Sequence, residues 1–352
     1  MFNFFGLNSI LGVDIGTASI KIAEISKSSP KPKLKNYGVL KGYSHLERPN
    51  SAIQSNALKI AEKETAELLK AIINKAGFKA KEAVAAIPSF SCFTAFLEVP
   101  QMSDVDMAKT MPFQISQNIP VPVSEAAIEW LKIGERETEE GVKQQILIIL
   151  IPKEIIGRYK TIFKLAGLKL LSVESESLSL VRALIGGDPT STLIIDIGSH
   201  STNIAISDEG VLRANRFTDF AGASLTQAIA GGLNINVRRA EELKIRKGLK
   251  AVGGEYELST LPQPFLDVII NEAAKAKEEY EKKFNRRIER IILAGGGANL
   301  IGINEYIEKQ INLPIITANA FLQVSYPKEL ELLVKELGPE FSVAIGLGIK
   351  NN

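Results

Sequence analysis

The chain has 352 residues, of which 45% are apolar and 23% are charged, and its formal net charge is +2. This composition is typical of a folded globular protein, and the near-zero charge gives no global field that would favour nucleic acid. At this length the chain can form about two domains, each with its own core. Cys92 is the only cysteine, and His45 and His200 are the only histidines, so an internal disulfide is impossible and a histidine-based metal site is nearly excluded.

Apolar runs bounded by turn residues alternate with segments of helical periodicity along the chain. The predicted strands are, in order, ILGVDI, IKIAEIS, KLKNYGVL, EAVAAIP, FTAFLEV, QILIILIP, TLIIDIG and RIILAGG. The predicted helices span residues 53–76, 153–166, 174–184, 223–230, 237–247, 266–284 and 301–310. This alternation predicts an α/β protein with largely buried sheets. No apolar run reaches the roughly 20 residues of a membrane span, and the start MFNFFGLNSILG lacks signal-peptide features, so we expect a cytoplasmic protein.

One motif at the end of a predicted strand occurs twice in the chain. It is LGVDIGTASIK from Leu11 to Lys21 and LIIDIGSHSTNI from Leu193 to Ile204. In each copy an apolar strand ends in Asp-Ile-Gly, turns through small hydroxylated residues and continues as a second apolar stretch. The repetition predicts two related lobes that face each other across a cleft.

Residues 84–151 differ from the rest of the chain because they are rich in Pro and Phe and end in the polar stretch ERETEEGVKQQ. We expect a small inserted α+β subdomain whose polar stretch forms a hairpin tip or loop. The alternative is an ordinary part of the first lobe. The segment contains four phenylalanines that suit protein contact, although core packing would also explain them: Phe90, Phe93, Phe96 and Phe113.

The residues after the first Asp-Ile-Gly suit phosphate binding. Gly16 lets the backbone approach a ligand, Thr17 and Ser19 add hydroxyl donors, and Lys21 adds a point charge. A carboxylate at a strand end beside phosphates usually serves a hard cation such as Mg²⁺ through oxygen or water ligands. With two copies facing each other, Asp14 and Asp196 are the expected carboxylate pair.

A third loop, in IILAGGGANLIG, carries Gly295, Gly296 and Gly297 between a predicted strand and a predicted helix. Such a turn at a helix N-terminus lets a flat or anionic ligand lie against the backbone. Three glycine-rich loops in this order are more specific for nucleotide binding than any one of them.

On these motifs the chain resembles the actin-like ATPase superfamily. VDIGTASIK resembles its first phosphate loop, IIDIGSHSTNI its second, ILAGGGANLIG its adenosine loop, SVESESLSLVRAL the helix before the second phosphate loop, and FSVAIGLGIK its closing helix. From about residue 10 to residue 349 it most resembles the PilM family of type IV pilus assembly proteins. The resemblance implies a first lobe at 1–192 with an FtsA-like insertion at 84–151, a second lobe at 193–340, and a closing helix at 341–352 that returns to the first lobe.

The resemblance also implies site residues for ATP and Mg²⁺. Lys21 and Thr17 would contact the β- and γ-phosphates, while Asp14, Asp196 and Glu176 would hold Mg²⁺ through water. Glu241 and Lys244 would lie over the adenosine, although an i,i+3 charge pair on an exposed helix explains them equally well. The other residues expected at the nucleotide are Gly16, Ser19, Gly198, Ser199, His200, Ser201, Thr202, Gly295, Gly296, Gly297 and Ala298.

The second loop departs from the superfamily pattern. Many hydrolytic relatives have Gly-Gly-Thr after Asp-Ile-Gly, whereas this chain has Ser199, His200, Ser201 and Thr202. Histidine adopts positive φ more readily than most residues, so we expect a backbone role for His200 rather than general acid-base catalysis. Binding survives such a change more easily than hydrolysis, and we expect ATP turnover to be slow or absent.

The resemblance implies a scaffold of the pilus inner-membrane complex that docks the cytoplasmic N-terminal tail of PilN, along with other pilus proteins. The chain would then lie at the inner face of the membrane through its partner, because MFNFFGLN is too short to anchor it firmly. Two alternatives remain, a sugar or acetate-type kinase on the same fold and a filament-forming protein like FtsA or MreB.

Overall fold

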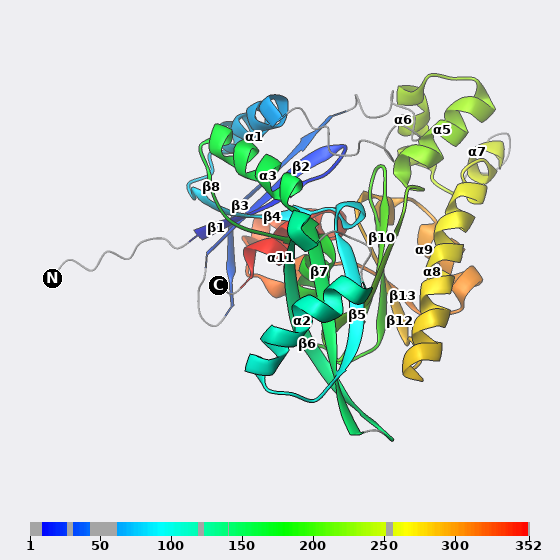
Figure 1. The fold of residues 1–352 in the computed structure, drawn as a ribbon. Helices are drawn as coiled ribbons and strands as arrows, with labels where there is room; N and C mark the ends of the chain where they lie inside the picture. Colours follow the sequence, from blue (N-terminus) through cyan, green and yellow to red (C-terminus); the bar gives the residue numbers. More distant parts are fainter. Residues whose placement is uncertain are drawn as a thin grey trace.

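Two five-stranded sheets with the same strand order form the centre of the molecule (Figure 1). The computed structural model describes residues 9–26, 31–42, 62–118, 123–139, 141–250 and 256–350. His45, the start MFNFFGLN and residues 53–61 of the first predicted helix lie outside the described residues.

The first sheet has the order β3-β2-β1-β4-β8. β1, β2 and β3 form an antiparallel meander, while β4 pairs parallel to β1 and β8 parallel to β4. The strands are β1 Ser9–Ile15, β2 Ser19–Ser26, β3 Lys33–Lys41, β4 Glu82–Ile87 and β8 Lys169–Ser175. The helices α1 Glu62–Ala76 and α3 Lys153–Ala166 pack against each other beside this sheet.

The second sheet has the order β11-β10-β9-β12-β13 and repeats every pairing direction of the first. Its strands are β9 Thr192–Ile197, β10 Thr202–Asp208, β11 Val211–Thr218, β12 Arg290–Ala294 and β13 Ile315–Thr317. The accompanying helices are α5 Gly222–Leu233, α6 Val237–Lys247, α7 Tyr256–Thr260, α8 Gln263–Phe284 and α9 Ile303–Ile311. The two lobes expected from the doubled strand ending are therefore present.

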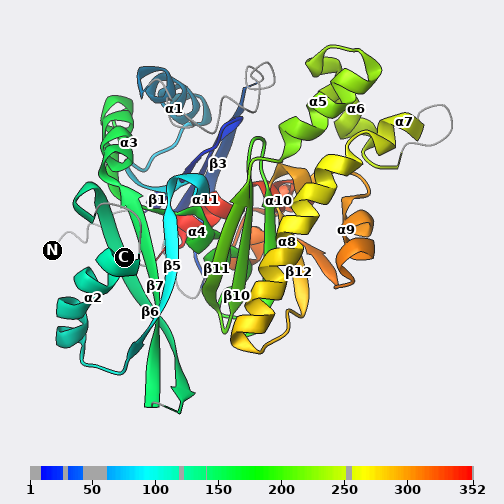
Figure 2. The same ribbon diagram turned by 45° about the vertical axis from the view of Figure 1, so that its right-hand side comes forward.

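Three helices connect the lobes: α4 Glu176–Leu184, α10 Glu331–Glu340 and α11 Ser342–Gly348. α11 packs on β1 and α4, so the end of the chain returns to the first sheet, and Figure 2 shows α4 and α11 between the two sheets. Two glycines permit this contact. A Cβ atom on Gly12 would lie 2.0 Å from the Ala344 carbonyl oxygen, and one on Gly346 would lie 2.1 Å from the Ser179 carbonyl oxygen.

The inserted unit is a three-stranded sheet of order β5-β7-β6 with one helix, as expected. It contains β5 Phe93–Pro100, α2 Asp104–Asn118, β6 Ala126–Thr138 and β7 Gly141–Pro152. β6 and β7 form a long hairpin that holds the polar stretch at its tip (Figure 1). Residues 84–87, which we assigned to the insertion, lie instead in β4, because their unbroken apolar run is buried between two parallel neighbours.

Short 3-10 helices complete the described structure: η3 Ser89–Ser91, η4 Val123–Glu125, η6 Gly296–Asn299, η7 Ala320–Gln323 and η8 Lys328–Leu330. The helix expected over 174–184 begins at Glu176, because residues 174 and 175 continue β8. No helix among the described residues is long and apolar enough to cross a membrane.

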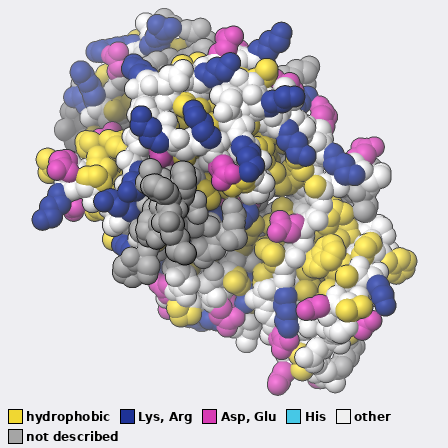
Figure 3. Space-filling model, turned by 90° about the vertical axis from the view of Figure 1, so that its left-hand side faces the viewer, with side chains coloured by type: hydrophobic (Ala, Val, Ile, Leu, Met, Phe, Trp, Pro, Cys, Tyr) yellow, Lys and Arg dark blue, Asp and Glu magenta, His cyan; other side chains and the backbone are white. Residues whose placement is uncertain are grey.

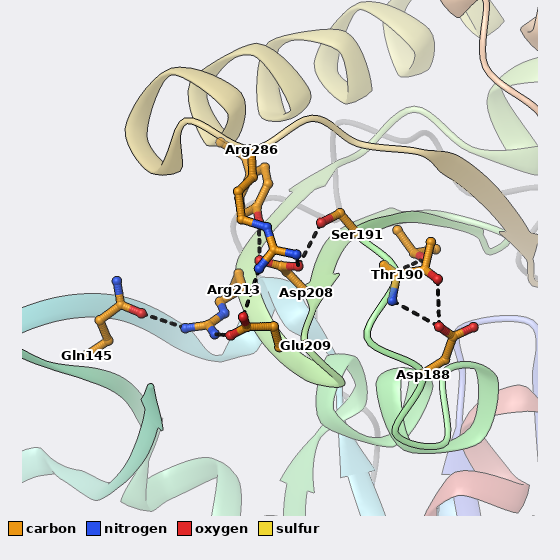
Figure 4. Close-up of polar contacts among 10 residues, drawn as sticks. Gln145, Asp188, Thr190, Ser191, Asp208, Glu209, Arg213 and Arg286 are labelled. Carbon is orange, nitrogen blue, oxygen red and sulfur yellow. Dashed lines mark hydrogen bonds and ion pairs between the residues drawn. The ribbon is translucent and has the colours of Figure 1, made fainter. Parts of the chain in front are cut away.

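A polar network attaches the inserted hairpin to the second lobe (Figure 4). The buried Arg213 of β11 donates to Gln145 of β7 at 2.7 Å and to Glu209 at 2.7 Å. Arg286, just after α8, pairs with Glu209 at 2.9 Å and with Asp208 at 3.0 Å. Because removing one member would leave buried charge unpaired, this network fixes the insertion to the second sheet.

Candidate functional site

The three glycine-containing loops lie around one cavity of about 400 Å³. The loops follow β1, β9 and β12, so each begins at the carboxyl end of a strand. Of the residues expected at a nucleotide, the following line the cavity: Asp14, Gly16, Thr17, Ser19, Lys21, Glu176, Asp196, Gly198, Ser199, Ser201, Glu241, Lys244, Gly295, Gly296 and Gly297.

Three expected residues do not line the cavity. His200, Thr202 and Ala298 are only 3%, 0% and 6% exposed, and they lie behind the loops. The Thr202 hydroxyl donates to the Phe220 carbonyl at 2.7 Å, which gives it a role in the loop itself. The φ of His200 is not positive, so its place in the loop does not depend on a left-handed backbone. The segment that enters α5 packs on the second loop and holds Thr202 in it.

The first loop makes a tight turn in which the Gly16 N–H donates to the Ser19 carbonyl at 3.0 Å. Asp14 and Lys21 face each other across β1 and β2, and the Lys21 ammonium lies 3.2 Å from the Asp14 carboxylate. Burial disfavours the charge of Lys21, but Asp14, with smaller contributions from Asp196 and Glu340, outweighs it and raises the lysine pKa. The loop therefore offers a fixed positive charge to the cavity.

The second loop repeats this turn, with the Gly198 N–H donating to the Ser201 carbonyl at 3.0 Å. The start of α5 holds it from behind. The Gly222 N–H donates to the Gly198 carbonyl at 3.1 Å, and the Ala223 N–H donates to the Ser199 carbonyl at 2.7 Å. The loop is thus tied to α5 before any ligand arrives.

Two further carboxylates, those of Asp196 and Glu176, line the cavity, and their surroundings disfavour the charged form. Burial, together with the nearby Asp14, raises the pKa of Asp196 to about 7 against the opposing effect of Lys21. Burial, Asp196 and Asp14 raise the pKa of Glu176 to about 8, although its side chain accepts the Ser89 N–H at 2.9 Å. Oxygen donors that repel one another in this way suit a hard divalent cation.

The predicted metal trio is not a ready-made cage. Within the described part of the chain, no group of three or more His, Cys, Asp and Glu side chains lies close enough to hold an ion by itself. Asp14 is nevertheless near enough to raise the pKa of Asp196, and Asp14 and Asp196 together raise that of Glu176. This arrangement fits Mg²⁺, which keeps several waters and takes further oxygens from a bound phosphate.

Glu241 and Lys244 of α6 are a paired and largely buried charge couple at the cavity wall. The ammonium of Lys244 lies 2.7 Å from Glu241 and donates to the Gly222 carbonyl at 3.0 Å and to the Thr226 hydroxyl at 2.8 Å. Burial lowers the pKa of Lys244 against the attraction of Glu241. The pair is therefore not an exposed surface couple, and it connects α6 to the α5 terminus that holds the second loop.

Sequence reasoning missed several residues of the cavity wall. Lys41, Glu336, Pro339 and Glu340 line it, and Lys41 pairs with Glu340 at 3.3 Å. The Gly295 N–H donates to the Pro339 carbonyl at 3.0 Å, which fixes α10 against the third loop. No local motif marks these positions. Glu336, Pro339 and Glu340 reach the cavity only when α10 folds back onto both lobes, and Lys41 lies at the end of β3.

Comparison with known proteins identifies relatives of the whole chain. The family model described as type IV pilus assembly protein PilM matches residues 12–352. The solved structure of the PilM-PilN type IV pilus biogenesis complex is similar with a TM-score of 0.82 and 21% identity, covering 97% of this chain and 99% of that one. Two looser matches are also solved structures. Ethanolamine utilization protein EutJ from Carboxydothermus hydrogenoformans has a TM-score of 0.57 and 15% identity, covering 97% of this chain and 89% of that one. MreB5 of Spiroplasma citri bound to AMPPNP has a TM-score of 0.54 and 15% identity, covering 93% of this chain and 97% of that one.

Among curated proteins, the cell division protein FtsA of Buchnera aphidicola subsp. Baizongia pistaciae is 29% identical over 150 residues, covering 35% of each chain. The chain thus spans about a third of the length of this curated relative. The matches agree with the doubled sheet and its inserted unit, so the chain has the actin-like ATPase fold. Because the family model covers residues 12–352, the chain belongs to the PilM family of type IV pilus assembly proteins.

Proposed function

We propose that the chain binds ATP with Mg²⁺ in the cavity between its lobes. The observation that carries this proposal is the pair of Asp-Ile-Gly loops, which make the same backbone turn on two sides of one cavity. A cavity of about 400 Å³ is in the range of small-molecule sites. The likeness of the fold to an AMPPNP-bound MreB5 supports the choice of a nucleotide.

In this proposal the first lobe holds the phosphates. The Lys21 ammonium neutralises phosphate oxygens, while the hydroxyls of Thr17 and Ser19 and the backbone N–H groups of the loops add donors. Asp14, Asp196 and Glu176 hold Mg²⁺ through water, and the ion when bound neutralises phosphate charge. The third loop and α6 provide a wall for the adenosine. Ser199 replaces a glycine of hydrolytic relatives, so turnover is slow or absent.

Isothermal titration calorimetry tests the site with Lys21→Ala and, as a matched control, Lys109→Ala on the exposed face of α2. Removing a charge partner from a desolvated site typically costs about 2 to 5 kcal/mol, so Lys21→Ala should bind ATP far more weakly while the control binds normally. Absence of ATP affinity in the unmodified chain would refute the site. Rapid steady-state ATPase activity would refute only the slow turnover.

We further propose that the chain is a scaffold at the inner face of the membrane and docks the N-terminal tail of PilN. Membership of the PilM family and the likeness to the PilM-PilN complex support this partner. A tail that is disordered when free suits an extended segment that adds to a sheet edge. In the three-stranded sheet β5 is an edge strand, and its Phe93 is 38% exposed, whereas Phe96 packs against the core.

Fluorescence anisotropy with a synthetic peptide of the PilN tail sequence tests docking at the β5 edge. Deleting residues 84–151 would remove part of β4 from the first sheet, so point variants are preferable. Phe93→Ser should weaken peptide binding. Phe113→Ser should not, since Phe113 lies on α2 rather than β5, and its side chain is 60% exposed. If Phe113→Ser weakens binding and Phe93→Ser does not, the tail docks at α2 instead of β5. No binding by the unmodified chain would refute the docking role.

A further inference from the structure

One edge of the first lobe gathers lysines from two helices and the segments that follow them. The face on the α1 and α3 side appears in Figure 3, where Lys and Arg side chains predominate over Asp and Glu in the upper half of the view. Lys75 lies in the last turn of α1 and Lys164 in the last turn of α3. We call the following six exposed residues the lysine edge: Lys75, Lys79, Lys81, Lys160, Lys164 and Lys169.

The backbone brings these two segments together. The Lys169 N–H donates to the Lys81 carbonyl at 2.8 Å, and α1 packs along α3. Residues 75–82 and 160–169 contain the six lysines and one acid, Glu82, which is a net charge of +5. Since the chain totals +2, the remaining residues carry a net −3. The lysine edge therefore concentrates positive charge on an otherwise slightly acidic protein.

Internal contacts explain little of this charge. Among the described residues only Lys169 has an ion-pair partner within the edge, Glu82 at 2.8 Å, and both side chains are well exposed. Lys75 and Lys164 each stabilise their own helix, because a positive charge in the last turn interacts favourably with the helix dipole. Lys160 and Lys164, however, stand four residues apart on one helix, where like charges repel and destabilise. A surface that accepts this repulsion is suited to an anionic partner outside the chain.

The composition of the edge distinguishes between anionic partners. The segments 75–82 and 160–169 contain no arginine, and their aromatic residues Phe78 and Phe163 are buried. Recognition of nucleic acid usually uses bidentate arginines and stacked aromatic rings. An array of lysines around an apolar side chain, here Leu165 at 41% exposure, is typical of a protein surface that lies against lipid headgroups.

We propose that the lysine edge docks directly on a bilayer surface that contains anionic phospholipids. None of the six lysines lines the nucleotide cavity, and none belongs to β5 or the inserted sheet. Lipid contact at this edge thus leaves ATP and PilN access free. It adds a membrane attachment that is independent of the partner protein.

Vesicle co-sedimentation with the full chain tests the proposal. The lipids are phosphatidylcholine alone, or phosphatidylcholine and phosphatidylglycerol in equal parts. The unmodified chain should sediment only with the anionic vesicles, and added salt should release it. Because each lysine near an anionic surface is worth about fivefold in affinity, substituting Lys79, Lys81, Lys160 and Lys164 by Gln should weaken binding by about a hundredfold or more.

A second quadruple variant controls for net charge, since it removes the same number of exposed lysines elsewhere: Lys109, Lys309, Lys328 and Lys335, each replaced by Gln. It should bind vesicles nearly as well as the unmodified chain. Both variants should bind ATP normally, which separates this test from that of the nucleotide site. Equal loss in both variants, no binding by the unmodified chain, or binding to an RNA oligonucleotide without binding to vesicles would overturn the proposal.

Discussion

The two Asp-Ile-Gly loops have the same backbone but different electrostatics. In both, the glycine N–H closes a turn onto the third residue beyond it at 3.0 Å. In the first loop the residue opposite Asp14 is Lys21, whereas in the second the residue opposite Asp196 is Asn203. Asn203 donates to the Ser177 hydroxyl instead. One residue on the neighbouring strand therefore decides whether the repeated aspartate is paired with a cation.

The strands that lead into the loops differ in packing, and again the difference lies at one position. Gly12 of β1 and Ile194 of β9 occupy equivalent positions, two residues before the aspartate. Gly12 lets α11 touch the β1 backbone, while the side chain of Ile194 belongs to the large core cluster. The lobes share a topology, yet only the first has room for the closing helix.

The largest expected effect is that of Gly12→Ala. The added Cβ atom would lie 2.0 Å from the Ala344 carbonyl oxygen, so β1 and α11 would have to separate. We expect the free energy of unfolding to fall by at least about 3 kcal/mol in urea denaturation. The equivalent change in the second lobe, Ile194→Val, should cost only about 1 kcal/mol. If both variants lose the same amount, the closing contact does not distinguish the lobes.

The next effect is a change in stability of opposite sign when each of the two aspartates is neutralised, and for Asp196 it depends on pH. An acid whose pKa is higher in the folded state keeps its proton there, so stability falls as pH rises from about 4, the unfolded value, through the folded value of about 7 for Asp196. Asp196→Asn removes this loss and should gain about 2 kcal/mol at pH 8, allowing for solvent screening, but nothing near pH 4.

Asp14→Asn serves as the comparison. This change leaves the Lys21 ammonium without its partner at 3.2 Å, so it should destabilise the chain at pH 8 rather than stabilise it. Thermal unfolding of both variants across this pH range measures the difference. Parallel curves for the two variants would mean that the loops do not differ in electrostatics.

The smallest expected effect compares the two turn glycines. A Cβ atom on Gly198 would lie 2.8 Å from the Ser201 carbonyl oxygen, while one on Gly16 would lie 3.1 Å from the Ser19 carbonyl oxygen. Because α5 also holds the second loop, that loop relaxes less easily. We expect Gly198→Ala to cost about 1 to 2 kcal/mol and Gly16→Ala less than about 1 kcal/mol, as measured by differential scanning calorimetry. A larger loss for Gly16→Ala would contradict this ranking.

The sequence by itself determined the doubled hairpin, the third glycine loop and the inserted α+β unit. A strand that ends in Asp-Ile-Gly is a local signal, since the alternation of apolar residues and the turn chemistry act over a few neighbouring positions. The resemblance of these motifs to one superfamily then predicted where Lys21, Asp196 and Gly295 would meet, and all three line the cavity.

Only the tertiary structure decided which loop residues face the cavity. His200 and Thr202 lie in the predicted loop but are buried, and the Thr202 hydroxyl donates to the carbonyl of Phe220, just before α5. Glu340 reaches the site from the far end of the chain, and Glu241 and Lys244 are largely buried where Lys244 donates to α5. Such burial depends on elements distant in sequence that pack over the loop, and no local pattern records that packing.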